Sequence, residues 1–178
     1  EINEPGAPVH QMVVDEAVYA LESHVRKGDA VVLAGSLPEG CKMETYAEII
    51  QYLKDLGARA YLDCDGEAFK LGVEAKPYLI KPNKYELAEL CGCDPEDDIA
   101  CLQEAKRLVA GGVGNVLLSL GSYGAIYVGE SFCLRAQGLK VPVIGRSGAG
   151  DAMTAAMVLG EEKGMPPEER LRYAIASA

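Results

Sequence analysis

The chain has 178 residues, 49% of them hydrophobic, and its 27 acidic and 17 basic residues give a net charge of −10. This length and apolar content suffice for one folded domain with a sizeable core. The negative charge disfavours nucleic-acid binding, because the field of the protein repels phosphates. A phosphate site in this chain must therefore be built locally, from backbone amides, Lys and Arg.

Membrane and metal-binding classes receive little support from the sequence. No apolar run reaches the roughly 18 residues that a membrane span requires. The six cysteines show no disulfide spacing. A zinc site at Cys91, Cys93 and Cys101 would need a fourth ligand, and both histidines lie far away in the sequence. We expect reduced thiols in a cytoplasmic protein.

Helical periodicity and short apolar runs alternate along the chain. Apolar residues recur at helical spacing from Val14 to Val25, and a continuous β-branched run follows over 29–35. The same alternation continues to the C-terminal end. It predicts helices over 14–25, 46–53, 67–71, 84–90, 97–109, 152–163 and 168–178, and strands over 29–35, 59–63, 78–80, 115–120, 124–128 and 132–135.

Buried strands that alternate with helices are typical of βαβ units. They predict an α/β fold with a mainly parallel sheet and helices on both faces. No linker or repeat divides the sequence, so we expect a single domain over 1–178. Ligands of such sheets bind beyond the carboxyl ends of the strands. The loops at those ends are therefore the candidates for the functional site.

The loop over 145–151 is the richest in chemical possibilities. Glycines let its backbone approach a ligand, and the free amides of the helix that follows favour an anion. The spacing from Gly145 to Gly150 is similar to a Walker phosphate loop, but Asp151 stands where that motif has Lys. A carboxylate there is placed to accept a proton from an attacking hydroxyl. The alternative is that Asp151 only caps its helix.

The loop after the strand at 78–80 contains Lys81, Asn83 and Glu86. Asn83 and Glu86 are three residues apart at a helix start, so both side chains can face one point. An amide oxygen and a carboxylate suit Mg²⁺ that is held largely through water and phosphate oxygens. A capping box has the same spacing, and the spacing alone favours that interpretation.

Two other loops and one strand end carry weaker signals. Gly35 and Ser36 follow the first strand, where Ser36 either binds a ligand or only forms a turn. Ser119 and Gly121 follow a later strand, without the glycine spacing of a dinucleotide site. Asp63 ends the strand over 59–63 and is a candidate for a secondary role near the site.

Taken together and in this order, the loops resemble those of the ribokinase/PfkB sugar kinases. Gly-Ala-Gly-Asp at 148–151, before a helix of small residues, matches the family signature, and Asn83 and Glu86 match its Asn-x-x-Glu motif. The segments over 2–6 and 35–38 resemble the branch that acts on phosphorylated hexoses. Within it the chain is most similar to the 1-phosphofructokinase group, followed by tagatose-6-phosphate kinases and minor 6-phosphofructokinases. The resemblance implies a ribokinase-like, three-layer α/β/α fold.

The resemblance also implies a reaction, the in-line transfer of a phosphoryl group from ATP to a phosphorylated hexose with Mg²⁺ as cofactor. Asp151 is then the base for the sugar hydroxyl. The amides of Gly148, Ala149 and Gly150 stabilise the charge on the transferring group. By the same resemblance, Asn83 and Glu86 organise Mg²⁺ through water. The nucleotide is contacted by Lys81, Ser119, Gly121 and Arg146, and the sugar phosphate by Gly35 and Ser36.

Family members are longer than this chain. A stretch before the position of Glu1 supplies the first strands and a β lid over the sugar, and a segment beyond Ala178 helps to close the adenine pocket. We therefore expect the chain to be the central-to-C-terminal portion of a kinase, weakly active or inactive by itself. The resemblance implies that the intact parent forms a homodimer through the lid.

Several substrates remain open at this point. Fructose 1-phosphate is favoured, before tagatose 6-phosphate and fructose 6-phosphate. Further alternatives are a same-fold kinase of an unphosphorylated sugar, a nucleoside or a vitamin, and a nucleotide-binding module without catalysis.

Overall fold

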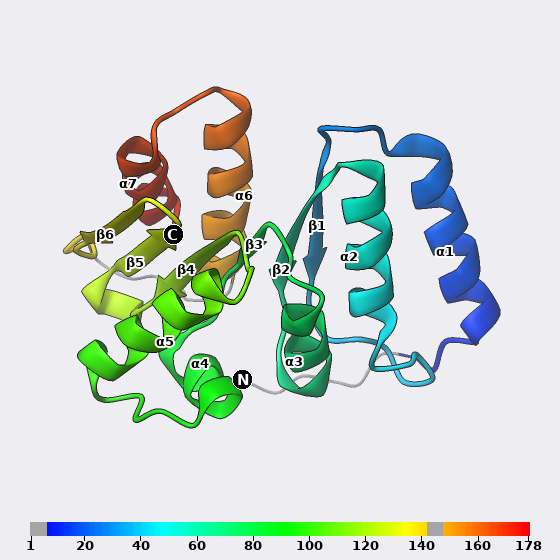
Figure 1. Cartoon of the computed structure of the whole chain (residues 1–178), viewed down its shortest axis with the longest axis horizontal. Helices are drawn as coiled ribbons and strands as arrows, with labels where there is room; N and C mark the ends of the chain where they lie inside the picture. Colours follow the sequence, from blue (N-terminus) through cyan, green and yellow to red (C-terminus); the bar gives the residue numbers. More distant parts are fainter. Residues whose placement is uncertain (1–6, 142–147) are drawn as a thin grey trace.

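The computed structural model describes residues 7–141 and 148–178. Figure 1 shows helices arranged around one sheet, whose six strands have the order β1-β2-β3-β4-β5-β6 among these residues. The strands are β1 (Ala30–Ala34), β2 (Arg59–Asp63), β3 (Leu79–Ile80), β4 (Asn115–Ser119), β5 (Ala125–Gly129) and β6 (Phe132–Ala136). The helices are α1 (Gln11–His24), α2 (Thr45–Leu56), α3 (Gly66–Glu74), α4 (Lys84–Cys91), α5 (Asp98–Ala110), α6 (Ala149–Glu162) and α7 (Pro167–Ser177). A short 3₁₀ turn, η1, spans Gly121–Tyr123.

The first four strands of the sheet run parallel, and β5 and β6 continue it as an antiparallel hairpin. In the parallel part, Ala34 pairs with Asp63 and Leu62 pairs with Ile80. The carboxyl ends of these strands therefore meet at one edge of the sheet, where an open α/β fold binds its ligands.

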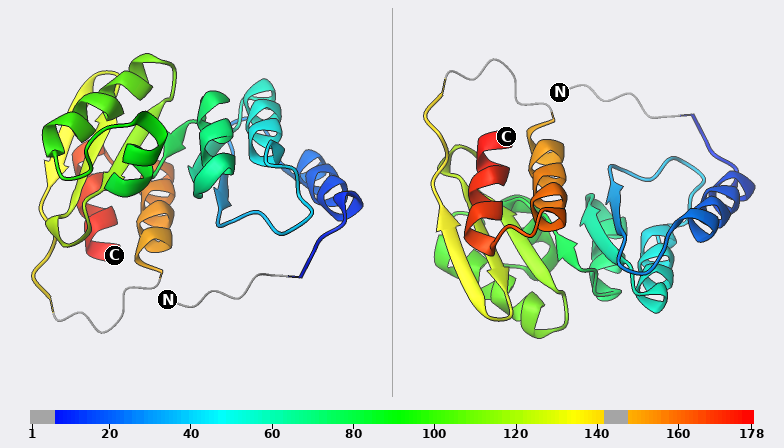
Figure 2. Two further views of the ribbon diagram at one scale, coloured as in Figure 1. Left: turned by 90° about the horizontal axis from the view of Figure 1, so that it is seen from below. Right: turned by 90° about the horizontal axis from the view of Figure 1, so that it is seen from above.

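Helices cover both faces of the sheet. Figure 2 shows α2, α3, α4 and α5 on one face and α6 with α7 on the other. Side chains alternate along each strand, so Leu62 of β2 joins the apolar cluster under α2 and α3, while Tyr61 joins the cluster under α6 and α7. Burying one such large side chain contributes about 1.5–3 kcal/mol to folding. These two apolar clusters, one on each face, fix the positions of the strands and so of the loops at their carboxyl ends.

The predicted three-layer α/β/α architecture is confirmed, with differences at element boundaries. Helix α6 begins at Ala149, three residues before its predicted start, because Gly148 adopts φ +81° as the N-cap and Gly150 is already helical. Helix α1 begins at Gln11, also three residues earlier than predicted. Among the described residues, no helix has the length and apolar character needed to cross a membrane.

Candidate active site at the carboxyl edge of the sheet

Backbone hydrogen bonds draw the strand-end loops together. The Gly35 N–H donates to the Asp63 carbonyl oxygen at 2.9 Å, and the Lys81 N–H donates to the Leu62 carbonyl oxygen at 3.1 Å. Beyond β3 and β4, Asn83 forms an isolated parallel bridge with Ser119. Loops predicted separately from the sequence therefore share one edge of the molecule.

The N-terminus of α6 lies at this edge. Its first intrahelical bond runs from the Ala152 N–H to the Gly148 carbonyl oxygen at 2.9 Å. The amides of Ala149, Gly150 and Asp151 come before that bond and have no acceptor within the helix, so they favour an anion. Gly148 occupies the N-cap, so the alternative that Asp151 caps this helix is wrong. The Asp151 side chain is exposed in the first turn.

Beneath this helix end lies a buried ion pair. The Lys81 ammonium is 3.0 Å from Asp63 Oδ1, and the two side chains are 9% and 15% exposed. The second carboxylate oxygen, Oδ2, accepts a hydrogen bond from Thr154 Oγ1 of α6 at 3.0 Å. A Cβ atom at Gly150 would lie 3.0 Å from the Lys81 Nζ, so the absence of a side chain there lets the helix approach the lysine.

Asn83 and Glu86 form the capping box that their spacing favours. Asn83 Oδ1 accepts from the N–H groups of Tyr85 and Glu86 at 2.8 and 3.0 Å. Glu86 Oε2 accepts from the Asn83 N–H at 2.8 Å. A carboxylate has about four acceptor positions, so Glu86 can also accept from cation-bound water. Asn83 Oδ1 uses both of its lone pairs in the capping bonds. The free acceptor positions of the Glu86 carboxylate are therefore what this pair offers Mg²⁺, which prefers oxygen ligands and keeps several waters.

The edge carries a negative field. Burial raises the pKa of Glu86; the Asn83 N–H and Lys81 oppose this rise, and Asp63 and Asp65 add to it. Burial, together with Asp65, Asp63 and Glu86, raises the pKa of the Cys64 thiol to about 12. The carboxylates of these three residues therefore act on one region, which favours a cation there.

The loop after β1 forms the next part of the edge. Gly35 has φ +83°, and its carbonyl oxygen accepts from the Tyr46 hydroxyl at 3.0 Å. Ser36 Oγ donates to Asp65 Oδ1 on the neighbouring loop at 3.4 Å. Gly121, with φ +60°, begins η1. Ser36 therefore contacts the loop after β2, rather than the α6 helix start.

Some predicted residues lie outside the described part of the chain, namely Gly145, Arg146 and the segment over 2–6. Sequence reasoning missed Thr154 and Asp65. Thr154 lies three positions after Asp151 in a helix, a spacing that places both residues on neighbouring parts of one helix face. That spacing could have indicated that Thr154 lies near the site, but it does not identify Asp63 as its hydrogen-bond partner.

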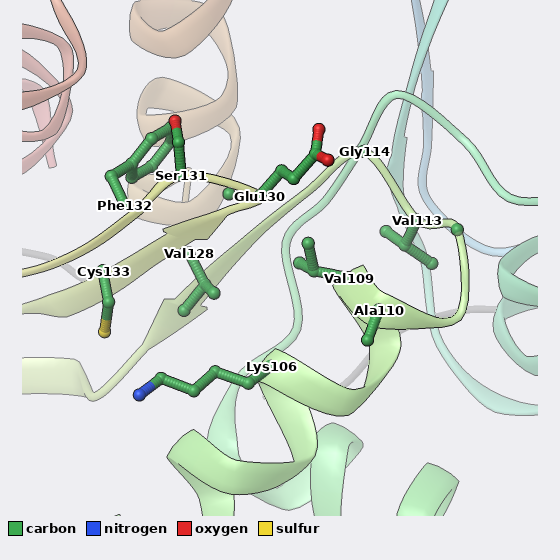
Figure 3. A pocket seen from close by; sticks show the side chains of 12 residues that line it. Lys106, Val109, Ala110, Val113, Gly114, Val128, Glu130, Ser131, Phe132 and Cys133 are labelled. Carbon is green, nitrogen blue, oxygen red and sulfur yellow. The ribbon is translucent and has the colours of Figure 1, made fainter.

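A groove lies at the opposite end of the sheet. It has a volume of about 810 Å³ and lies between the end of α5 and the β5–β6 hairpin. Figure 3 shows Lys106 on one side and Glu130 and Cys133 on the other. Because Gly114 in its wall precedes β4, this groove is at the amino end of the parallel strands, away from the loops described above.

The chain is similar to known proteins over almost its whole length. The model of the pfkB family carbohydrate kinases matches residues 2–178. A 1-phosphofructokinase of Vibrio cholerae is 33% identical over 176 residues, which are 99% of this chain and 56% of that protein. The Escherichia coli ATP-dependent 6-phosphofructokinase isozyme 2 is 32% identical over 182 residues, covering 97% of this chain and 56% of the relative.

Similarity extends to three dimensions. A crystal structure of phosphofructokinase-2 from Escherichia coli, in complex with substrates and products, has a TM-score of 0.92 and 28% identity over 98% of this chain and 57% of its own. This chain spans about half the length of the relatives it matches. The chain belongs to the pfkB family of carbohydrate kinases.

Proposed function

We propose that this pfkB-family chain carries the phosphoryl-transfer site of an ATP-dependent sugar-phosphate kinase. The observation that supports this most directly is the start of α6. There an exposed Asp151 stands in the same helical turn as three amides without intrahelical acceptors, above the Lys81–Asp63 pair. A proton acceptor beside an anion-stabilising helix end is what transfer of a phosphoryl group to a hydroxyl requires.

In the proposed mechanism, the oxygen of the sugar hydroxyl attacks the terminal phosphorus of ATP, and Asp151 accepts the proton of that hydroxyl. The amide of the N-cap residue Gly148 and the first-turn amides of Ala149 and Gly150 donate hydrogen bonds to the phosphoryl oxygens. The charge on these oxygens spreads as the bond to the leaving phosphate breaks. The helix dipole adds a partial positive charge at the same place. These groups stabilise the transition state more than the bound ATP.

The proposed cofactor is Mg²⁺, bound beside Glu86 and Asn83 mostly through water. When bound, the ion neutralises charge on the ATP phosphates. Glu86 would orient the waters of such an ion through one carboxylate oxygen, while its Oε2 keeps the capping bond to the Asn83 N–H. The Lys81 ammonium has three N–H donors, so it can contact a phosphate oxygen while retaining Asp63.

The rest of the proposed site follows the strand-end loops. Ser119 and Gly121 contact the nucleotide, and Gly35 and Ser36 contact the phosphorylated sugar. We propose Arg146 as a further phosphate contact from its place in the sequence alone. The homodimer and the cytoplasmic location stay predictions.

Fructose 1-phosphate is the proposed acceptor, with fructose 1,6-bisphosphate as product. The Gly-Ser-Leu-Pro turn at 35–38 and the similarity to a protein named 1-phosphofructokinase support this choice. The similarity to an ATP-dependent 6-phosphofructokinase supports fructose 6-phosphate as the second candidate.

The test is ADP release by the full-length protein with ATP and Mg²⁺. The acceptors compared are fructose 1-phosphate, fructose 6-phosphate, tagatose 6-phosphate, fructose and ribose. We expect the highest kcat/KM with fructose 1-phosphate. A preference for an unphosphorylated sugar would contradict the substrate class, and turnover on none of the five would contradict the proposed kinase.

A further inference from the structure

We infer that Thr154 is a positioning residue for the phosphoryl-transfer site, and that it fixes the N-terminal part of α6 to strand β2 through the Asp63 carboxylate. The inference rests on the proposed function for its kinetic consequence. Its structural consequence, an immobilised helix start, is independent of that function.

The Thr154 hydroxyl is placed for this task. The residue is 2% exposed, and its helix neighbours Met153, Ala156 and Met157 belong to the apolar cluster under α6 and α7. Packing alone would be satisfied by Val, which has nearly the same shape. The hydroxyl instead lies 3.0 Å from Asp63 Oδ2 and 3.3 Å from the Gly150 carbonyl oxygen. Its one proton therefore serves the carboxylate or its own helix turn.

Asp63 connects the hydroxyl to the rest of the site. One carboxylate oxygen accepts from Thr154, and the other lies 3.0 Å from the Lys81 ammonium. Lys81 in turn lies directly under Gly150. The ends of β2 and β3 are thus joined to the first turns of α6 by one continuous set of polar contacts.

The contacts of Thr154 with Asp63 and of Asp63 with Lys81 fix the distance between the start of α6 and the sheet. Asp151 and the three first-turn amides move with α6, and their distances to the reacting phosphoryl group depend on where the helix starts. Misplacement by about 1 Å can cost on the order of 100-fold in rate. Without the hydroxyl, Asp63 Oδ2 loses its donor from the helix. The N-terminal part of α6 then keeps its apolar contacts and the close approach of Gly150 to Lys81, while Glu161 still holds the far end of the helix to Arg59 and Tyr61.

The test compares Thr154→Val with Thr154→Ser in the full-length protein. For Thr154→Val we expect kcat to fall about 10- to 100-fold, while KM for ATP and for the sugar phosphate changes less than about threefold. Hydrogen exchange of the peptide over 149–156 should become about tenfold faster. Thr154→Ser, which keeps the hydroxyl, should restore both quantities.

Thr45→Val is the matched control. Thr45 is also buried, at 5% exposure, but its Oγ1 donates at 2.7 Å to the carbonyl oxygen of Lys42, in the turn just before α2. We expect Thr45→Val to leave kcat and the hydrogen exchange of the peptide over 149–156 unchanged. If Thr154→Val does not fold, Thr154→Ala against Thr45→Ala makes the same comparison without a branched side chain.

The outcomes separate the two proposals. Normal kcat and normal exchange in Thr154→Val, with an active wild type, would overturn the positioning role and leave the kinase standing. An inactive wild type would overturn the kinase, and exchange over 149–156 would still decide whether the hydroxyl holds the helix. Failure of Thr154→Ser to restore exchange would assign the effect to packing and overturn the inference.

Discussion

The C-terminal end of α6 carries a second polar cluster, centred on Glu161. Its carboxylate accepts from Arg59 Nη1 at 2.9 Å and from Arg170 Nη1 at 2.6 Å. It also accepts from the hydroxyls of Tyr61, at 3.0 Å, and of Tyr78. Burial and the neighbouring carboxylate raise the pKa of Tyr61, which keeps its hydroxyl a donor. We predict that Glu161→Ala strongly destabilises the fold.

The expected size follows from burial. The side chains of Glu161, Arg170 and Arg59 are 17%, 11% and 23% exposed. Removing one partner of a buried ion pair costs about 3–5 kcal/mol, because the other charge stays buried without compensation. Arg59 retains Glu162 and some solvent, which lowers the cost, whereas two tyrosine hydroxyls lose their acceptor, which raises it. We expect a loss of about 4 kcal/mol, a large part of a typical stability of about 5–15 kcal/mol.

Urea unfolding at neutral pH, followed by circular dichroism, measures this loss. Thermal unfolding should show a Tm lower by about 8–16 °C, at about 2–4 °C per kcal/mol for a chain of this length. Glu67→Ala is the control, because the side chains of Glu67 and its partner Lys70 are 57% and 55% exposed, and such surface pairs contribute about 0.2–1 kcal/mol. A Glu161→Ala protein within about 1 kcal/mol of wild type would refute the assignment of a buried, coupled cluster.

Two predictions concern the carboxylates of the candidate active site. Asp151→Asn should lower kcat by about 10²–10⁴-fold, the range for a positioned acid–base group, while calorimetry finds ATP binding little changed; a retained kcat would remove Asp151 from the base role. Glu86→Gln keeps the capping-box acceptor but does not titrate. Because burial raises the pKa of Glu86, the wild type gains stability from its protonated form at low pH and loses it as pH rises through the raised pKa. The unfolding free energy of wild type minus that of Glu86→Gln should therefore fall as the pH rises above the ordinary glutamate pKa of 4.5, and a flat difference would contradict the raised pKa.

Much of the fold was predictable from the sequence because its signals are local. Continuous apolar runs such as 59–63 are typical of strands buried on both faces, and the helices between them show the 3.6-residue period. The edge that carries the site followed from topology, since the carboxyl ends of parallel strands lie together. The spacing of Asn83 and Glu86 left a capping box and a metal site open. The structure contains the capping box, and the metal role stays a prediction.

The polar contacts within the site were not predictable, because they join distant parts of the chain. Thr154 and Asp63 are 91 residues apart, and neither residue type indicates its partner. The start of α6 was misplaced for a related reason. Glycine is a poor helix former, so Gly148 and Gly150 indicate a loop, but the close approach to Lys81 favours a glycine inside the first turn.

Helix α6 is thus attached to strand β2 at both of its ends. Thr154 contacts Asp63 at the carboxyl end of β2, and Glu161 contacts Arg59 and Tyr61 nearer its amino end. Seven positions separate the two helix residues, or about 10 Å at 1.5 Å per residue. Sites at that distance without shared partners usually act independently, so the stability losses of Thr154→Val and Glu161→Ala should add to within about 0.5 kcal/mol in urea unfolding. The loss in kcat should follow Thr154 alone, because only that contact lies beside the amides and the Asp151 carboxylate. If the stability loss of the double variant differs strongly from the sum of the two single losses, α6 moves as a rigid body when either contact is removed. The two clusters would then position the helix together.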